Sequence, residues 1–253
     1  MTLTKAVSVV GYKNSGKTRV VEALVKELSD RGYRVGTLKH TAEDVLLDTP
    51  GKDTWRHREA GSQATAILHG KGSAFFIDRY FTVNEAASRL GSLDFVVLEG
   101  FKSLETMAKI VVPREAGEVE GLSNGLEVAI VDLVGGGLQS QGGVPVVPLE
   151  AGRLADIVEA RAFPMLSGLG CHGCGYEDCL GHGRAILAGE ASFESCVGYA
   201  SSFTLRVNGE AVALGPFVQD ITRNVVLGLV RSFKGVEAAS RVELEFEVGG
   251  GDG

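Results

Sequence analysis

The first motif in the chain that could do chemistry is Gly11-Tyr-Lys-Asn-Ser-Gly16-Lys17-Thr18, which matches G-x-x-x-x-G-K-[S/T] at every fixed position. In such a loop, backbone N–H groups and the N-terminus of the next helix surround phosphate oxygens. The Lys17 ammonium would reach the β- and γ-phosphates, and the Thr18 hydroxyl would bind Mg²⁺. A glycine turn that happens to precede a helix is the plainer alternative. We predict a nucleoside triphosphate site formed by Gly11, Asn14, Ser15, Gly16, Lys17 and Thr18.

A magnesium ion at this loop needs an acidic partner, and Glu99 is the candidate. It ends the apolar run Phe95-Val-Val-Leu, which is typical of a buried strand whose last residue reaches the site. An ordinary charge at the end of a strand is the alternative. The turn Asp48-Thr-Pro-Gly-Lys-Asp53 carries two more carboxylates and a lysine, and a plain loop explains this turn equally well.

The chain has four cysteines in one short segment, separated by two, four and sixteen residues: Cys171, Cys174, Cys179 and Cys196. Four thiols are the complement for a tetrahedral metal or a cubane cluster. Structural zinc sites usually use two Cys-x-x-Cys pairs, and only one close pair occurs here. We therefore predict a [4Fe-4S] cluster, with zinc and unligated thiols as alternatives. The segment also resembles the four-cysteine [4Fe-4S] domain of some electron-transfer proteins. His172 and His182 are expected outside the ligand set.

The elements that must position these residues alternate between strands and helices. Apolar runs predict strands at 6–10 and 33–38, with a helix between them whose apolar residues recur at helical spacing. Strand, glycine-rich turn, helix and strand in this order indicate a parallel sheet. Further strands are predicted at 64–68, 75–77, 95–98, 110–112, 128–131 and 144–147, helices at 54–60, 83–90 and 151–162, and surface loops at 113–126 and 135–143.

These elements predict an α/β P-loop NTPase domain with a mostly parallel sheet at residues 1–165. A small Cys-rich module should follow at 166–200, then a small α+β unit of ββαβ order at 201–248 and a disordered tail at 249–253. In the α+β unit, Asn208-Gly209 predicts a hairpin turn and Pro216 begins an amphipathic helix that Gly235 ends. Residues 242–248 alternate apolar and acidic like a half-exposed strand.

The composition limits the class of protein further. The 253 residues are 44% hydrophobic and 23% charged, which are values of a globular protein. A formal net charge of -7 argues against a nucleic-acid-binding or membrane-surface protein. No apolar run approaches the roughly 20 residues of a membrane span, and the N-terminus shows no signal-peptide pattern. We expect a cytoplasmic protein, where cysteines more often bind metal than form disulfides.

Several motifs occur together in an order that is typical of one family. They are the phosphate-binding loop (Gly11–Thr18), Val35-Gly-Thr-Leu-Lys-His40, the turn from Asp48 to Asp53, Trp55-Arg-His-Arg-Glu-Ala-Gly61 and Leu98-Glu-Gly-Phe-Lys102. Together they resemble the molybdopterin-guanine dinucleotide biosynthesis protein B family over residues 5 to 165. The resemblance implies a dimeric protein that binds GTP with Mg²⁺ and has weak GTPase activity at most. It implies as partners the molybdenum cofactor nucleotidyltransferase that attaches GMP to molybdopterin, with molybdopterin itself or a molybdoenzyme as further partners.

Carried over by position, the resemblance assigns Lys17 and Thr18 to the phosphates and magnesium, and Glu99 to the magnesium side. It places Asp48 and Asp53 in the loop that faces the γ-phosphate, where they are the candidate catalytic acids together with Glu99.

The base-recognition residue has to be chosen differently, because the chain carries no Asn-Lys-x-Asp guanine motif. We select Asp132, which follows the strand at 128–131, to accept hydrogen bonds from guanine N1 and N2. An acid that merely begins a loop is the alternative. Arg56, His57 and Arg58 form a basic cluster that could meet phosphates of GTP or of a pterin, or could form a solvated helix face.

Two other function classes also fit the phosphate-binding loop. A P-loop small-molecule kinase would use Asp48 or Asp53 to activate a substrate hydroxyl, but no arginine-rich lid insertion is visible. A GTP-dependent scaffold would bind the nucleotide without hydrolysing it and recruit a target through its C-terminal module. Weak turnover leaves no motif, so the sequence does not separate a slow GTPase from a scaffold.

Overall fold

The computed structural model describes residues 3–41, 45–135, 137–138, 140, 142–197, 205–207, 210–212, 214, 216–234 and 242–244. The strands of its main sheet are β1 (Lys5–Val10), β2 (Val35–Lys39), β5 (Phe95–Glu99), β6 (Ala108–Val111), β7 (Glu127–Asp132), β8 (Val146–Pro148) and β9 (Phe163–Pro164). The helices around it are α1 (Lys17–Asp30), α3 (Val83–Arg89), α4 (Glu118–Leu122), α5 (Ala151–Arg161), α6 (Cys179–Ala188) and the short 3₁₀ helix η1 (Phe193–Ser195).

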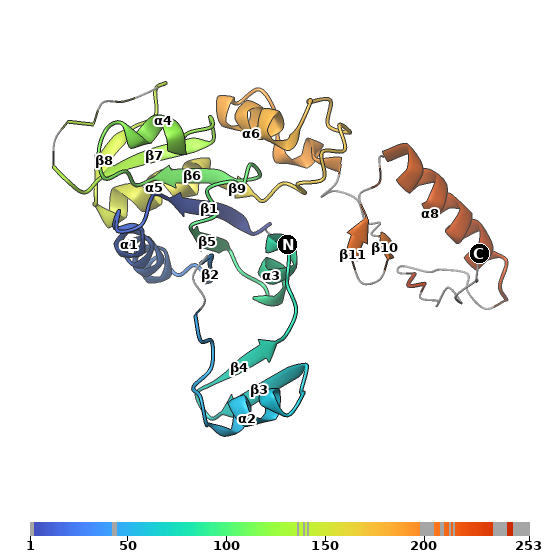
Figure 1. The fold of residues 1–253 in the computed structure, drawn as a ribbon. Coiled ribbons are helices and arrows are strands. Elements are labelled where there is room, and N and C mark those ends of the chain that lie inside the picture. The colour runs from blue at the N-terminus through green and yellow to red at the C-terminus, as the bar shows by residue number, and fades with distance from the viewer. Residues whose placement is uncertain are drawn as a thin grey trace.

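The seven strands form one sheet with β1 near its middle (Figure 1). The strand order is β2-β5-β1-β6-β7-β8, and every neighbouring pair in this order is parallel. The short strand β9 pairs antiparallel with the start of β1. The predicted α/β fold with a mostly parallel sheet is therefore confirmed. Because β1, β2 and β5 run in the same direction, the residues at their carboxyl ends gather at one edge of the sheet.

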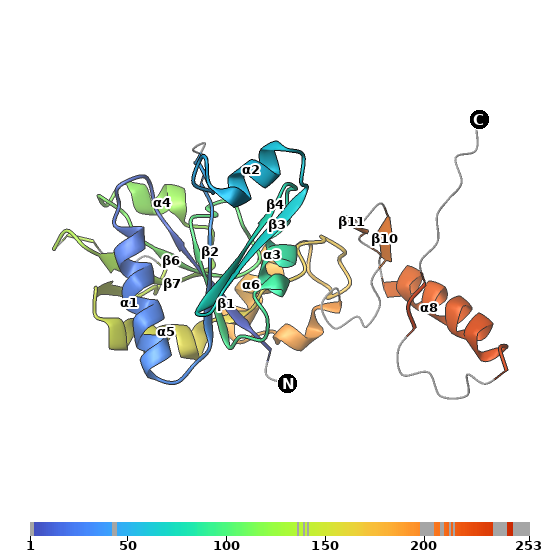
Figure 2. The same ribbon diagram turned by 90° about the horizontal axis from the view of Figure 1, so that it is seen from below.

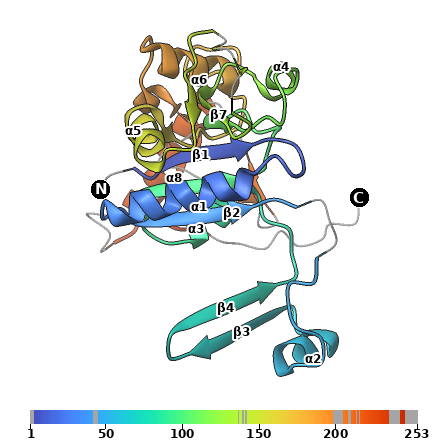
Figure 3. The ribbon, with the colours of Figure 1, turned by 90° about the vertical axis from the view of Figure 1, so that its left-hand side faces the viewer.

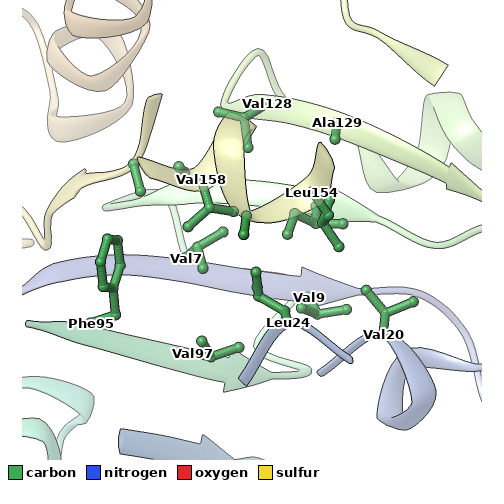
Figure 4. Packing of buried hydrophobic residues seen from close by; sticks show 14 of the residues in the cluster. Val7, Val9, Val20, Leu24, Phe95, Val97, Val128, Ala129, Leu154 and Val158 are labelled. Atoms are coloured by element: carbon green, nitrogen blue, oxygen red, sulfur yellow. The ribbon is translucent and has the colours of Figure 1, made fainter. Parts of the chain in front are cut away.

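One face of the sheet is covered by α1 and α5, which Figure 2 shows side by side. Val7 and Val9 point from β1 into this layer, where Leu24 of α1 and Leu154 of α5 are fully buried (Figure 4). Each such side chain contributes about 1.5–3 kcal/mol by leaving water. This packing fixes α1 against β1, and so it fixes the loop between them.

The opposite face is covered by α3, α4 and the segment that joins β5 to β6. Ala6, Leu98 and Met107 form one buried cluster on this face, and Val119 and Leu122 of α4 close a second. The prediction of a surface loop at 113–126 was wrong for α4, which is a short helix within that range. Its charged and glycine residues suggest a loop, but the two apolar side chains are buried and hold the helix against the sheet.

The Cys-rich segment packs on the same core as α1 and α5. Leu166, Phe193 and Cys196 belong to that cluster and are nearly or fully buried. Gly183 lets α6 approach, because a Cβ there would lie 2.8 Å from Leu126 Cδ2 and 3.5 Å from Phe163 Cζ. The segment thus shares the core of the sheet domain, and its separation as a module at residue 166 stays a prediction.

The hairpin lobe (residues 45–80) projects from the edge of the sheet near β2 (Figure 3). It contains α2 (Asp53–Glu59) and the antiparallel pair β3 (Ala64–His69) and β4 (Gly72–Ile77). None of its residues is buried. The two strands were predicted, whereas their separation from the main sheet was not.

Further elements stand to one side of the sheet in Figures 1 and 2: β10 (Leu205–Val207), β11 (Glu210–Val212) and α8 (Pro216–Arg231). The first two pair antiparallel, and the helix begins at the predicted proline. The predicted turn at Asn208-Gly209, the helix end at Gly235 and the tail at 249–253 lie outside the described residues, as does most of the strand predicted at 242–248. Residues 242–244 form no strand, so the ββαβ unit as a whole stays a prediction.

Candidate functional site

The loop between β1 and α1 has the backbone geometry of an anion site. Asn14 and Gly16 adopt left-handed conformations with φ of 63° and 88°, and the N–H of Ser15 donates to the Tyr12 carbonyl at 3.2 Å. Successive N–H groups in such a turn form a concavity that binds anions. Since α1 begins at Lys17, the positive end of its dipole lies at the same place. The geometry fits phosphate groups.

Two further features of the loop are a close backbone approach at Gly11 and a buried hydroxyl at Ser15. A Cβ on Gly11 would lie 2.3 Å from the Val112 carbonyl oxygen and 2.4 Å from Ser15 Oγ, so only glycine allows this approach. Ser15 Oγ is buried and has no hydrogen-bond partner among the described residues. A buried hydroxyl without a partner is costly, and a phosphate oxygen would satisfy it.

Lys17, the predicted phosphate-binding lysine, contacts the backbone of its own loop. Its Nζ donates to the Tyr12 carbonyl at 2.6 Å. Burial lowers the pKa of the Lys17 ammonium; the Glu99 carboxylate opposes this effect, while Lys102 and Lys39 add to it. The cations therefore repel one another at this edge of the sheet, and a polyanion would relieve that repulsion.

The Tyr12 ring brings two more cations to the loop. The Lys102 ammonium lies 4.4 Å from the ring centroid, and the Arg114 guanidinium lies 5.6 Å from it. These are cation–π distances. Lys102 comes from the segment after β5 and Arg114 from the segment after β6, so the carboxyl ends of both strands that flank β1 contribute positive charge.

The magnesium side of the site joins residues from three elements. Thr18 Oγ1 in α1 donates to Glu99 Oε1 at the end of β5 over 2.9 Å. Lys39 Nζ at the end of β2 lies 3.1 Å from the same carboxylate oxygen. Hydroxyl and carboxylate oxygens are the ligands that Mg²⁺ prefers, so this pair fits an ion bound together with a nucleotide. The structure brings Thr18 and Glu99 together; their role at magnesium stays a prediction.

A pocket of about 210 Å³ adjoins the phosphate-binding loop. Its lining combines apolar and cationic side chains: Asn14, Ser15, Gly16, Arg19, Pro113, Arg114, Leu133 and Val134. These residues come from the start of α1 and from the loops after β6 and β7. An apolar wall beside cations and phosphate-binding N–H groups suits the sugar and base of a nucleotide.

Asp132 ends β7 directly before two residues that line this pocket. Its Oδ1 accepts from the N–H of Val134 at 2.9 Å and from the N–H of Gly135 at 3.0 Å. One carboxylate oxygen is therefore used to fix the turn. The position suits base recognition, and that role of Asp132 stays a prediction.

Asp48 and Asp53 lie in the hairpin lobe, which Figure 3 shows apart from β1 and α1. Asp48 Oδ1 accepts from the Thr49 N–H at 2.7 Å and from Thr54 Oγ1 at 3.1 Å, so it stabilises the start of α2. Asp53 is the exposed first residue of that helix. In this conformation the structure does not bring the two acids to Lys17 and Thr18, and their catalytic role stays a prediction.

The basic cluster predicted beside them divides into two parts on α2. Arg56 and His57 are exposed. Arg58 forms an ion pair with Asp78 at 2.7 Å and lies 5.6 Å from the centre of the Phe76 ring. Arg58 thus joins α2 to β4, whereas the other two side chains face solvent.

All four cysteines lie among the described residues, and all are free thiols. Cys196 is buried and the other three are half-buried. Within the ranges that the structure describes, no group of three or more His, Cys, Asp or Glu side chains could hold a metal ion. The thiols are therefore not gathered around a common centre, and the cluster stays a prediction.

His182 has a structural place that the sequence did not reveal. It is 1% exposed, its ring stacks on Tyr176 at 5.1 Å, and its Nε2 lies 2.9 Å from Ser195 Oγ and 3.2 Å from the Ser192 carbonyl. These contacts connect α6 to η1, and they occupy the imidazole within the segment.

The family model for molybdopterin guanine dinucleotide synthesis protein B matches residues 6–134, which is half of the chain and includes all of β1 but its first residue, the phosphate-binding loop, Glu99 and Asp132. The chain belongs to this family. A putative molybdopterin-guanine dinucleotide biosynthesis adapter protein of Methanocaldococcus jannaschii is 28% identical over 249 residues, which cover 96% of this chain and 98% of that one. The likeness therefore extends through the cysteine segment and the elements after it.

Other relatives match a smaller share of the chain. The molybdopterin-guanine dinucleotide biosynthesis adapter protein of Escherichia coli is 32% identical over 120 residues, 45% of this chain and 68% of that protein. The crystal structure of Bacillus subtilis MobB is similar with a TM-score of 0.55 and 26% identity, covering 63% of this chain and 98% of that one. The fold of this family member thus agrees with a solved structure over 63% of its length.

The site also contains residues that sequence reasoning missed, namely Tyr12, Lys39, Lys102 and Arg114. Lys39 and Lys102 lie in two of the motifs that carry the family resemblance, so their motifs were visible but their chemical roles were not. Tyr12 occupies a variable position of the phosphate-binding loop, and only the fold places Arg114 beside it. In the part of the chain that the structure describes, no helix is long and apolar enough to cross a membrane.

Proposed function

We propose that this family member binds GTP with Mg²⁺ at the phosphate-binding loop and serves as an accessory protein in molybdopterin guanine dinucleotide biosynthesis. The observation that carries the proposal is the convergence of Lys17, Thr18 and Glu99 at one edge of the sheet, with Thr18 Oγ1 and Glu99 Oε1 2.9 Å apart. The names of its relatives supply the process.

In this proposal each group has one task. The loop N–H groups and Lys17 bind the phosphates, while Thr18 and Glu99 orient toward the magnesium ion, which would neutralise charge on the phosphate oxygens. Turnover is weak at most, with Glu99, Asp48 and Asp53 as the acids proposed for it. The proposed partner is the nucleotidyltransferase that uses the guanine nucleotide. Molybdopterin or a molybdoenzyme is proposed as a further partner.

The test is a calorimetric titration of the protein with GTP and with ATP, each with and without Mg²⁺, followed by pull-down with the nucleotidyltransferase. Magnesium-dependent GTP binding supports the proposal, and absence of binding to either nucleotide overturns it. Release of a phosphorylated small molecule would favour the kinase alternative, and GTP binding without any hydrolysis would favour the scaffold.

We predict that Asp132→Asn lowers the preference for GTP over ATP while leaving the magnesium dependence unchanged. The amide oxygen can still accept the two turn N–H groups, but the amide nitrogen cannot accept from guanine N1 and N2. Adenine has neither donor, so ATP affinity should stay the same. Competition titrations measure the ratio, and an unchanged ratio would show that the base is recognised elsewhere.

We also keep the [4Fe-4S] cluster as a proposal for the cysteine segment, supported by the four thiols and their spacing. Protein prepared without oxygen should be brown, with absorption near about 400 nm and about four irons per chain. Cys174→Ser should lose the colour and keep GTP binding, because Cys174 is only half-buried and lies outside the phosphate-binding loop. Colourless anaerobic protein with one zinc and no sulfide would favour structural zinc.

The homodimer is a further proposal, and the hairpin lobe is the surface we assign to it. Leu46, Leu68, Phe75 and Tyr80 are 78, 76, 69 and 87% exposed. Large exposed apolar side chains within one lobe are candidates for a protein–protein contact. A second copy of the chain would cover them.

A further inference from the structure

Lys109 is a lysine inside the central sheet. It lies in β6, and its Cα pairs with Ser8 of β1 on one side and Glu127 of β7 on the other. Its side chain is 1% exposed. Lysine is almost never fully buried unless its ammonium is paired, so the position needs a reason.

The Lys109 amine donates a hydrogen bond to the backbone of a neighbouring segment. Nζ donates to the Lys102 carbonyl at 3.0 Å. The adjacent Ser8 hydroxyl is buried and has no partner among the described residues, so Nζ is not committed to it. Burial lowers the pKa of the Lys109 ammonium, and the Glu127 and Glu105 carboxylates counteract this. The bond to the carbonyl is therefore the specific contact that the buried amine makes.

The carbonyl that Lys109 holds belongs to a strained turn. Gly100 and Phe101 directly before it both have positive φ, 95° and 57°. A bulky residue with positive φ is uncommon and persists only where surrounding contacts hold it. The Gly100 N–H donates to the Val9 carbonyl at 2.9 Å, which fixes the turn at its start, and Lys109 fixes it at its end.

Both ends of this turn carry groups of the nucleotide site. Glu99, before Gly100, accepts from Thr18, and the Lys102 side chain lies over the Tyr12 ring. A shift of the turn would therefore move the carboxylate and the cation together.

We propose that Lys109 is a positioning residue for the magnesium side of the site, acting by holding the Lys102 carbonyl and so fixing the turn between Glu99 and Lys102. This inference rests on the proposed function. It assigns no contact between Lys109 and the nucleotide.

The test is Lys109→Met, which keeps the length of the side chain and removes the donor. GTP affinity would be titrated at increasing MgCl₂ in the otherwise complete protein. We expect the half-saturating Mg²⁺ concentration to rise about three- to tenfold, the range of one lost hydrogen bond, and GTP affinity without Mg²⁺ to change less. Lys5→Met is the matched control, because Lys5 Nζ also donates to a backbone carbonyl, that of Glu159 at 2.6 Å, at the opposite end of β1.

A double-mutant cycle separates positioning from loss of stability. In a Glu99→Gln background, Lys109→Met should change the magnesium requirement no further, whereas a general destabilisation would add to it. Should Lys109→Met fail to fold, Gly100→Ala disturbs the same turn, and an unchanged magnesium requirement in that variant would overturn the inference.

Two outcomes distinguish this inference from the function on which it rests. If wild-type protein binds GTP without regard to Mg²⁺, the proposed function and the role of Lys109 are both overturned. If the wild type depends on Mg²⁺ and Lys109→Met has the same dependence, only the role of Lys109 is overturned.

Discussion

A Lys17→Ala variant should bind GTP about 10- to 100-fold more weakly than the wild type while its fold persists. The Lys17 ammonium contacts the phosphate-binding loop directly, with Nζ 2.6 Å from the Tyr12 carbonyl. A charge-assisted hydrogen bond contributes about 1.5–3 kcal/mol, which corresponds to that range of affinity. The buried apolar residues of α1 lie further along the helix, at Val20, Val21, Leu24 and Leu28, so their packing is unaffected. Isothermal titration calorimetry measures the change.

The matched control is Lys26→Ala on the same helix. Lys26 is 76% exposed in its side chain and pairs with Asp30, away from the loop. Exposed pairs of this kind contribute little, so its GTP affinity should equal that of the wild type. Equal affinities of the two variants would remove the phosphate-binding assignment of the loop.

A Gly11→Ala variant should lose most GTP binding and also some stability. The added Cβ would lie 2.3 Å from a backbone oxygen, that of Val112, which cannot rotate away, and 2.4 Å from Ser15 Oγ. Overpacking costs about 1–3 kcal/mol, and for a chain of this size each kcal/mol lowers Tm by about 2–4 °C. The loop must move away from the end of β6, so its N–H groups no longer converge. We expect GTP affinity to fall more than about tenfold.

Gly70→Ala tests whether the effect is local. Gly70 lies between β3 and β4, has no atom within 4 Å of an added Cβ, and is outside the left-handed region. Thermal melts and GTP titrations of this variant should match the wild type. Wild-type binding by Gly11→Ala would show that the close approach to Val112 is dispensable.

The sequence predicted the sheet domain well because its signals are local. A short apolar run, a glycine-rich turn and a helix with its apolar residues on one face specify β1, the phosphate-binding loop and α1 without reference to the rest of the chain. The strand ending in Glu99 was predicted for the same reason, and its parallel pairing with β1 places the carboxylate beside Thr18.

What the sequence missed depends on tertiary contacts. The α4 turn forms because Val119 and Leu122 find a buried place on the sheet, while their neighbours are charged. The strands β3 and β4 have the same pattern as sheet strands, so nothing local says that they pair only with each other. Lys109 stood just before a predicted strand, and its burial follows from the strands on both sides.

For the site itself, the chemistry of single residues was easier to predict than which residues lie next to one another. Thr18 and Glu99 meet because β1, which leads into α1, pairs in parallel with β5, which ends at Glu99. Asp48 and Asp53 were grouped with them through a motif order, but the chain between β2 and α2 leads them into a lobe of their own. A motif order specifies which residues occur together and leaves the path of the chain between them undefined.

The glycine at position 183 has a practical consequence for anyone who cuts this chain. Gly183 lets α6 pack directly on Leu126 and Phe163, so a fragment that ends at residue 165 would expose these apolar side chains to water. In such a fragment β9, which pairs with the start of β1, would be the C-terminal end of the chain. A soluble fragment for nucleotide studies should therefore run through Cys196, the last buried residue of the core cluster that contains these side chains. The cysteine segment therefore belongs to the same hydrophobic core as α1 and α5, and β9 joins it to the start of β1.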